Sequence, residues 1–155
     1  MTSRIISALL LVGLFLIVQQ VAAQDSVINF GISLSLSPTG TLRQTQSLSV
    51  WEGLQLWLEK VNARGGSVIR NATYTYNITK YEDDGVLDNV IPLYRQMLND
   101  SSIDYLMGPI NSDFTIPLLA YTEPAQRLLV ATSAGSDSFY RGNNFAFSVV
   151  QPSSR

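Results

Sequence analysis

Residues 27–66 constrain the fold most, because they place a strand, a polar loop and a long helix one after another. The run VINFGISLSL predicts a strand over residues 27–36, with an apolar face of even-numbered residues and a small or mixed face of odd-numbered ones. A Ser-Pro-Thr-Gly loop ends the strand. An amphipathic helix is expected over residues 44–63, with Gly65 as its left-handed C-terminal cap. This order predicts the opening unit of an α/β sheet.

The rest of the chain repeats the alternation of strands and helices. Further strands are predicted over residues 73–81, 105–107, 128–131 and 145–150. Helices are predicted over residues 87–98 and from Ser112, as a possible cap, to just before Pro124, with a loop or short helix over residues 132–142. Pro92 fits only a first turn, so its helix is expected to begin near Asn89. We therefore expect an α/β fold with an open parallel sheet of strand order 2-1-3-4-5 and helices on both faces.

The N-terminal segment indicates export from the cytoplasm. Arg4 precedes an apolar run over residues 5–18, and Val-Ala-Ala ends at residue 23, which predicts a signal peptide over residues 1–23 with cleavage before Gln24. The alternative is an uncleaved signal anchor, although the apolar run is shorter than the roughly 20 residues that span a bilayer. Residues 24–155 then form one domain, and a net charge of −2 without a basic stripe argues against a nucleic-acid partner.

The chain contains no Cys and no His, and this excludes several functions. A disulfide, a Ser-His-Asp triad, a Cys-His pair and a His-ligated zinc site are all ruled out within the chain. The nucleophile-elbow and dinucleotide-binding glycine patterns are also missing from the sequence. We therefore expect no metal, no cofactor and no enzymatic activity. Ser-Lys and carboxylate chemistry survive, so a secreted α/β hydrolase without His is the alternative.

The loops after the strands are the candidate binding segments. In an open parallel sheet, ligands bind beyond the carboxyl ends of the strands, where the strand order reverses. The loops at residues 37–40, 108–112 and 132–136 are rich in hydroxyls, amides and small residues, and carry no charge before Asp113 and Asp137. Neutral hydroxyls and backbone N–H groups suit an anionic group such as a carboxylate. The alternative is that these are ordinary turn and capping residues.

Asp83-Asp84 is a weaker signal. Paired carboxylates can perform acid/base chemistry or hold a metal, but the favoured interpretation is a solvated strand end. Trp51 lies on the first helix and could approach the cleft, but we interpret it as a core residue.

Five segments together carry a family resemblance: INFGISLSLSPTGTL, LEKVNARGG, YEDDG, LMGPINS and LLVATSAGS. In order and spacing they resemble the type I periplasmic-binding-protein superfamily, and within it the leucine/isoleucine/valine-binding group. Extracellular ligand-binding regions of eukaryotic receptors belong to the same superfamily. The resemblance covers residues 27–151 and implies two similar lobes that close over a ligand like a hinged clamp. This chain is long enough for only the first lobe.

The resemblance also implies ligand-binding residues. Ser112 matches the serine whose hydroxyl and backbone N–H hold the α-carboxylate of an amino acid. Ser133 and Ala134 match the loop that holds the ligand's polar end. Gly135 stands where amino-acid binders carry a Thr, and Ser136 is the possible substitute one residue later. The predicted ligand-binding set is completed by Asn111 and Thr39.

The leading interpretation is an extracytoplasmic small-molecule binding module. It would be the first lobe of a receptor ligand-binding region or of a solute-binding protein, with an amino acid or a similar small carboxylate as ligand. Sequons at Asn71, Asn77 and Asn99 favour a secreted or cell-surface glycoprotein, or a periplasmic protein if the source is bacterial. A second lobe and a downstream membrane or signalling domain would lie outside this chain. A surface glycoprotein that binds no small molecule is a further alternative.

Overall fold

The computed structural model describes residues 26–38 and 40–154, so the predicted signal peptide and Thr39 lie outside the described residues. The elements, in chain order, are β1 (Ser26–Leu34), α2 (Leu42–Ala63), β2 (Ser67–Ile69), β3 (Ala72–Glu82), α3 (Leu87–Asn99), β4 (Tyr105–Met107), α4 (Ser112–Thr115), the 3₁₀ turn η1 (Ile116–Leu118), α5 (Leu119–Thr122), β5 (Leu129–Ala131), the 3₁₀ turn η2 (Asp137–Tyr140) and β6 (Ala146–Ser148). No helix in the described ranges is long and apolar enough to cross a membrane.

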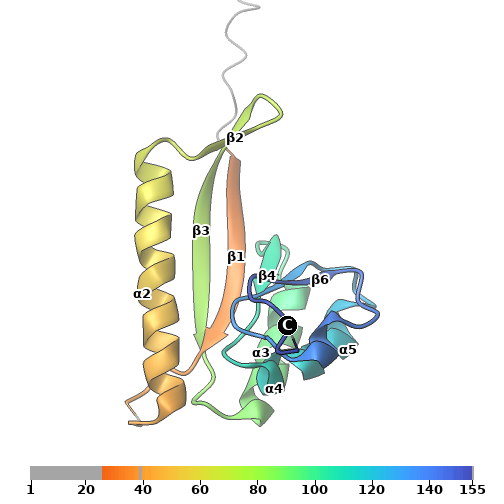
Figure 1. The fold of residues 1–155 in the computed structure, drawn as a ribbon. Helices are drawn as coiled ribbons and strands as arrows, with labels where there is room; N and C mark the ends of the chain where they lie inside the picture. Colours follow the sequence, from red (N-terminus) through yellow and green to blue (C-terminus); the bar gives the residue numbers. More distant parts are fainter. Residues whose placement is uncertain (1–25, 39, 155) are drawn as a thin grey trace, which may run out of the picture.

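The sheet has six strands in the order β2-β3-β1-β4-β5-β6. Five of these strands run parallel to one another, in the order β3-β1-β4-β5-β6. They reproduce the predicted order 2-1-3-4-5. The expectation of an entirely parallel sheet is wrong at one edge, where β2 pairs antiparallel with β3. Arg70 and Asn71 form the connecting turn with φ of 49° and 68°, the positive values that a two-residue hairpin requires. Figure 1 shows this hairpin at the end of the long β1–β3 pair where both strands begin.

Helix α2 packs on the face of the sheet that carries the even-numbered residues of β1. Ile32 and Leu34 of β1 and Ile78 of β3 are buried there, and the α2 residues Val50, Trp51, Leu54 and Leu58 pack against them. The apolar face predicted for β1 and the core interpretation of Trp51 are both confirmed. The Lys80 ammonium lies 4.5 Å from the centre of the Trp51 ring.

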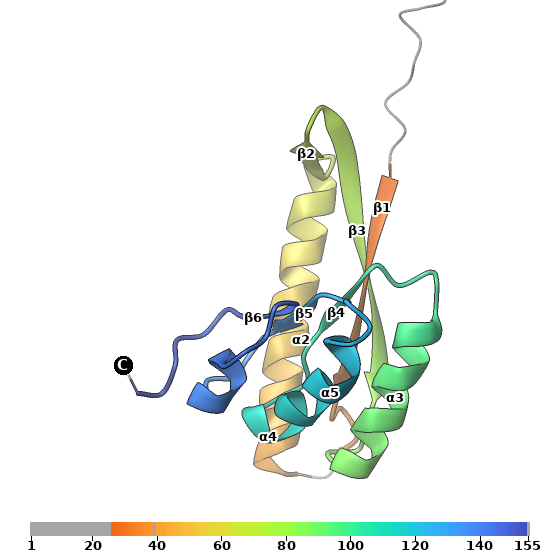
Figure 2. The ribbon, with the colours of Figure 1, turned by 90° about the vertical axis from the view of Figure 1, so that its right-hand side faces the viewer.

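Helices α3, α4 and α5 lie on the other face of the sheet, opposite α2 (Figures 1 and 2). The small odd-numbered residues of β1 allow α3 to approach, since a Cβ atom at Gly31 would lie only 2.7 Å from the Met97 sulfur. Tyr94 is fully buried and donates a hydrogen bond to the Met107 carbonyl. Burial raises the pKa of the Tyr94 hydroxyl well above its usual value, so that it remains a protonated donor that ties α3 to the end of β4.

Two helix predictions need correction. Helix α3 begins at Leu87 and not near Asn89, so Pro92 lies in its second turn. Pro92 and Asp88 are both exposed, so water can satisfy the carbonyl that the missing proline N–H leaves free. The single helix expected after residue 112 is divided into α4, η1 and α5, with Pro117 in the 3₁₀ turn.

Candidate ligand-binding site

The loops after β1, β4 and β5 lie on one rim of the sheet, because these adjacent strands run parallel and end at the same edge. Figure 1 shows β1 and β3 ending near α4 and the start of α2. The gathering of the three loops was the central spatial expectation from the sequence, and it is confirmed.

Two serine hydroxyls tie the loop after β4 to the loop after β5. The Asn111 N–H donates to Ser133 Oγ over 3.1 Å, and the Ser136 N–H donates to Ser112 Oγ over 3.0 Å. Each hydroxyl therefore accepts from the opposite loop and keeps its own proton, which no described residue accepts. The pair of loops holds both oxygens in place and leaves two O–H donors uncommitted.

A cavity of about 310 Å³ lies between these loops and the first turns of α2. Its walls are formed by Thr45, Gln46, Ser49, Val50, Ile110, Asn111 and Ser133. Val50 and Ile110 supply an apolar surface, and the other five supply hydroxyl, amide and backbone groups. A small ligand with an apolar part and a few polar atoms fits walls of this composition.

The predicted binding residues occupy different places around this cavity. Asn111 and Ser133 line it, whereas Ser112 and Ser136 form their hydrogen bond beside it. Ala134 is fully buried, and its carbonyl accepts from Ser148 Oγ over 2.8 Å. Thr39 is outside the described residues. Ligand binding by any of these residues stays a prediction.

The polar side of α2 was not anticipated as a wall of the site. Thr41 caps the helix by accepting from the Gln44 N–H over 3.2 Å, which starts α2 directly at the rim. Thr45, Gln46 and Ser49 then follow on its first turns. The available signal was the uncharged polar run QTQS at residues 44–47, one turn after the loop and beside an apolar stripe.

Ser112 does not cap α4, contrary to the sequence prediction. Asn111 is the N-cap residue, with φ of 73° and no side-chain capping bond. The Asn111 N–H donates to Ser133, and Ser112 is the first helical residue, with a hydroxyl that accepts from the Ser136 N–H.

An ion pair joins the first turn of α2 to α4. The Arg43 guanidinium contacts the Asp113 carboxylate over 3.1 Å and lies 4.0 Å from the centre of the Phe114 ring. Neither charged residue lines the cavity. The walls therefore present hydrogen-bonding groups without formal charge.

The interpretation of Asp83-Asp84 as a solvated strand end is wrong for Asp83. Asp83 is only 1% exposed, and its carboxylate accepts from Ser33 Oγ over 2.8 Å, from Ser35 Oγ over 2.7 Å and from the Gly85 N–H over 3.0 Å. Asp84 is exposed, as predicted. Asp83 thus fixes the end of β1 under the rim, and no group of acidic residues within the described ranges is arranged to hold a metal ion.

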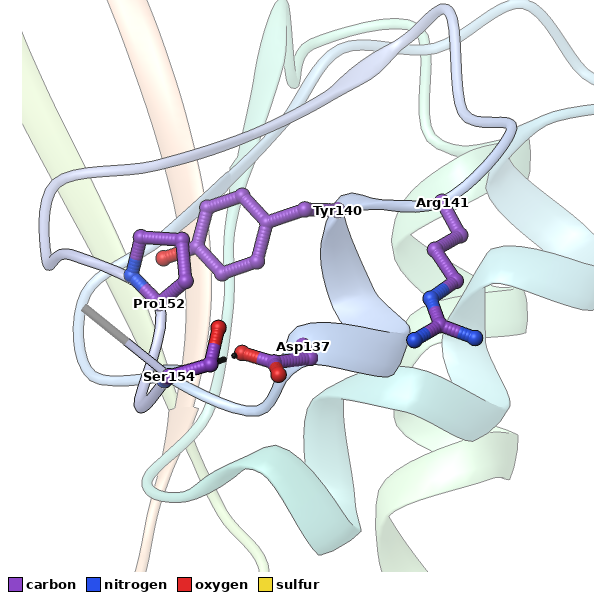
Figure 3. A pocket seen from close by; sticks show the side chains of 5 residues that line it. All are labelled: Asp137, Tyr140, Arg141, Pro152 and Ser154. Atoms are coloured by element: carbon purple, nitrogen blue, oxygen red, sulfur yellow. Dashed lines mark hydrogen bonds between the residues drawn. The ribbon is translucent and has the colours of Figure 1, made fainter.

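A second cavity, of about 280 Å³, lies beyond the end of β6 and has charged walls. It is lined by Asp137, Tyr140, Arg141, Pro152 and Ser154, whose side chains Figure 3 shows. The Ser154 N–H donates to the Asp137 carboxylate over 3.3 Å, so part of this wall is already paired. None of the predicted binding residues lines this cavity.

The chain is similar to known proteins both in its sequence, through a family model, and in its fold. A family model described as periplasmic binding protein matches residues 28–154. The branched-chain amino acid transporter substrate binding protein LivJ from Streptococcus pneumoniae, solved with isoleucine, is similar at 19% identity and a TM-score of 0.68, over 82% of this chain and 34% of that one. The leucine binding protein LivK from Thermotoga maritima is similar at 13% identity and a TM-score of 0.66, over 81% of this chain and 33% of that one.

A third similar structure carries a different ligand. It is a solute binding protein of an ABC transporter from Rhodopseudomonas palustris, in complex with 3,4-dihydroxybenzoic acid, at 11% identity and a TM-score of 0.64, over 81% of this chain and 32% of that one. The chain thus spans about a third of the length of these solved proteins and matches one lobe of their fold.

Proposed function

This chain belongs to the periplasmic binding protein family, and we propose that it is a binding module for a small carboxylic acid, such as an amino acid or a similar compound. The observation that carries the proposal is the Ser133 hydroxyl in the wall of an uncharged cavity. Its oxygen is held by the Asn111 N–H, and its proton is available to a ligand. A carboxylate oxygen is a strong acceptor for such a donor.

The similar solved proteins support a carboxylic acid as the ligand class. Two of them were solved in complex with isoleucine and with 3,4-dihydroxybenzoic acid. Both compounds combine a carboxyl group with an apolar part. The cavity here offers the matching pair of surfaces, since Ser133 lies on one wall and Val50 and Ile110 supply the apolar contact.

The chain represents the first lobe of a hinged clamp in this proposal. It spans about a third of the solved proteins, so a second lobe would close over the exposed rim. We propose an extracytoplasmic location for this module, as part of a receptor or of a solute-binding protein. Asn71, Asn77 and Asn99 are all exposed, which leaves the three sequons open to glycosylation. The similar proteins are binding proteins, which favours binding over catalysis.

The proposal is tested by titrating the chain with leucine, isoleucine and 3,4-dihydroxybenzoate, with binding followed by ligand-observed NMR. One lobe supplies half of a clamp, so we expect weak binding, of roughly millimolar affinity. Ser133→Ala should weaken binding by about ten- to a hundredfold, because a hydrogen bond to a charged group contributes about 1.5–3 kcal/mol.

Ser102→Ala is the matched control. It removes an exposed hydroxyl from the loop before β4, at the opposite end of that strand, where Asp100 accepts from both the Ser102 N–H and the Ser102 hydroxyl. The proposal requires this variant to bind like the wild type. Absence of binding by all three acids, or equal affinities of the two serine variants, would refute it and would favour a surface protein that binds no small molecule.

A further inference from the structure

The two walls of the cavity have opposite hydrogen-bonding character. On the α2 wall, Thr45 Oγ1 donates to the Thr41 carbonyl over 3.3 Å, and Ser49 Oγ donates to the Thr45 carbonyl over 3.1 Å. A hydroxyl has one proton and two lone pairs. Both hydroxyls have therefore used their protons within the helix, and only lone pairs remain for a ligand.

The loop wall has the reverse character. Ser133 Oγ already accepts from the Asn111 N–H and retains its proton. The side chains of Gln46 on the α2 wall and of Asn111 on the loop wall each carry both a donor and an acceptor group, so they do not alter this difference between the hydroxyls. The site therefore offers a donor on the loop side and two acceptors on the α2 side.

The absence of formal charge limits which ligand donor can face α2. None of the seven lining residues is charged, and the neighbouring Arg43 and Asp113 are paired with each other. A ligand ammonium group would find no carboxylate partner among the lining residues, whereas Ser133 supplies a donor for the ligand carboxylate. A ligand hydroxyl gives the same kind of hydrogen bond without a second charge.

We propose that the α2 wall selects hydroxy acids, with Thr45 or Ser49 accepting the single hydrogen bond that the ligand hydroxyl can donate, while Ser133 donates to the ligand carboxylate. This inference rests on the proposed function, because it assumes that an acid binds in this cavity. Thr45 and Ser49 are then specificity-determining residues. They distinguish a hydroxy acid from the same acid without the hydroxyl and from the corresponding amino acid.

Three compounds of nearly equal shape test the inference: 2-hydroxy-4-methylpentanoate, 4-methylpentanoate and leucine. Their dissociation constants for the full chain are measured by ligand-observed NMR. We expect the hydroxy acid to bind about five- to tenfold more tightly than either of the others, the range that one neutral hydrogen bond gives.

The double variant Thr45→Val, Ser49→Ala separates the α2 wall from the rest of the site. Both residues are exposed, so the fold should tolerate the changes. This variant should weaken the hydroxy acid to the level of 4-methylpentanoate and leave the latter's affinity unchanged. Ser102→Ala should alter neither.

The outcomes separate the two proposals. If all three acids bind equally and Ser133→Ala still weakens them, the proposed function stands and the selection by α2 is wrong. Leucine binding as tightly as the hydroxy acid would also overturn it. If none of the acids binds, both proposals fail.

Discussion

Gly66→Ala is expected to lower the free energy of unfolding by about 4 kcal/mol, a large part of the total stability of a domain of this size. Gly66 follows α2 and has φ of 87°, a left-handed value that alanine rarely adopts. A Cβ atom there would lie 2.0 Å from the Tyr74 carbonyl oxygen on β3. This neighbour is backbone within the sheet, so it cannot move aside as a flexible side chain can.

Gly65→Ala is the matched control, because Gly65 has nearly the same φ, 85°, but open space where its Cβ would be. We expect this variant to lose only about 1 kcal/mol, the usual cost of a left-handed alanine. Urea unfolding followed by circular dichroism measures both. Similar losses for the two variants would show that Gly66, just after α2, does not lie against the Tyr74 carbonyl of β3.

Asp83→Ala is expected to lower the free energy of unfolding by about 3 kcal/mol. The substitution removes the acceptor of three hydrogen bonds at once and leaves the Ser33 and Ser35 hydroxyls and the Gly85 N–H without a partner. Because these groups hold the end of β1 and the loop after β3, the rim should loosen as well. Ligand affinity should then fall along with stability.

Asp88→Ala provides the comparison for Asp83. Asp88 lies five residues further on, is exposed, and contributes only through its position in the first turn of α3. We expect its removal to cost about 0.5 kcal/mol. The free energies of unfolding of both variants are measured by chemical denaturation. If Asp83→Ala lowers the free energy of unfolding as little as Asp88→Ala does, the buried carboxylate does not stabilise the rim.

The main lines of the fold follow from local sequence signals. The apolar even-numbered positions of β1 predict the face on which α2 packs, and the Gly-Gly pair after α2 predicts its left-handed end. The rim follows from topology alone, since adjacent parallel strands end at one edge. These signals depend on periodicity and backbone conformation, which neighbouring residues determine.

The errors arise where distant residues decide the outcome. Its neighbours in the sequence indicate that Asp83 is solvated, but the hydroxyls that bond to it come from the end of β1 and from the residue after Leu34, 50 and 48 positions away. The local sequence predicts Ser112 as a helix cap, but its hydroxyl oxygen accepts a hydrogen bond from the Ser136 N–H instead. Four residues of α2 complete the cavity only because the helix starts at the rim. Local patterns carry no information about such pairings.

The central claim is that a small acid binds between the start of α2 and the loops after β4 and β5. The most direct measurement is a titration of the ¹⁵N-labelled chain with 2-hydroxy-4-methylpentanoate, read at assigned backbone amides. The account predicts shifts at Ser49, Asn111 and Ser133, with little change at Ser102 or at the Asn71 turn. Shifts concentrated instead around Tyr140 and Ser154, or at the hairpin end of the sheet, would contradict it.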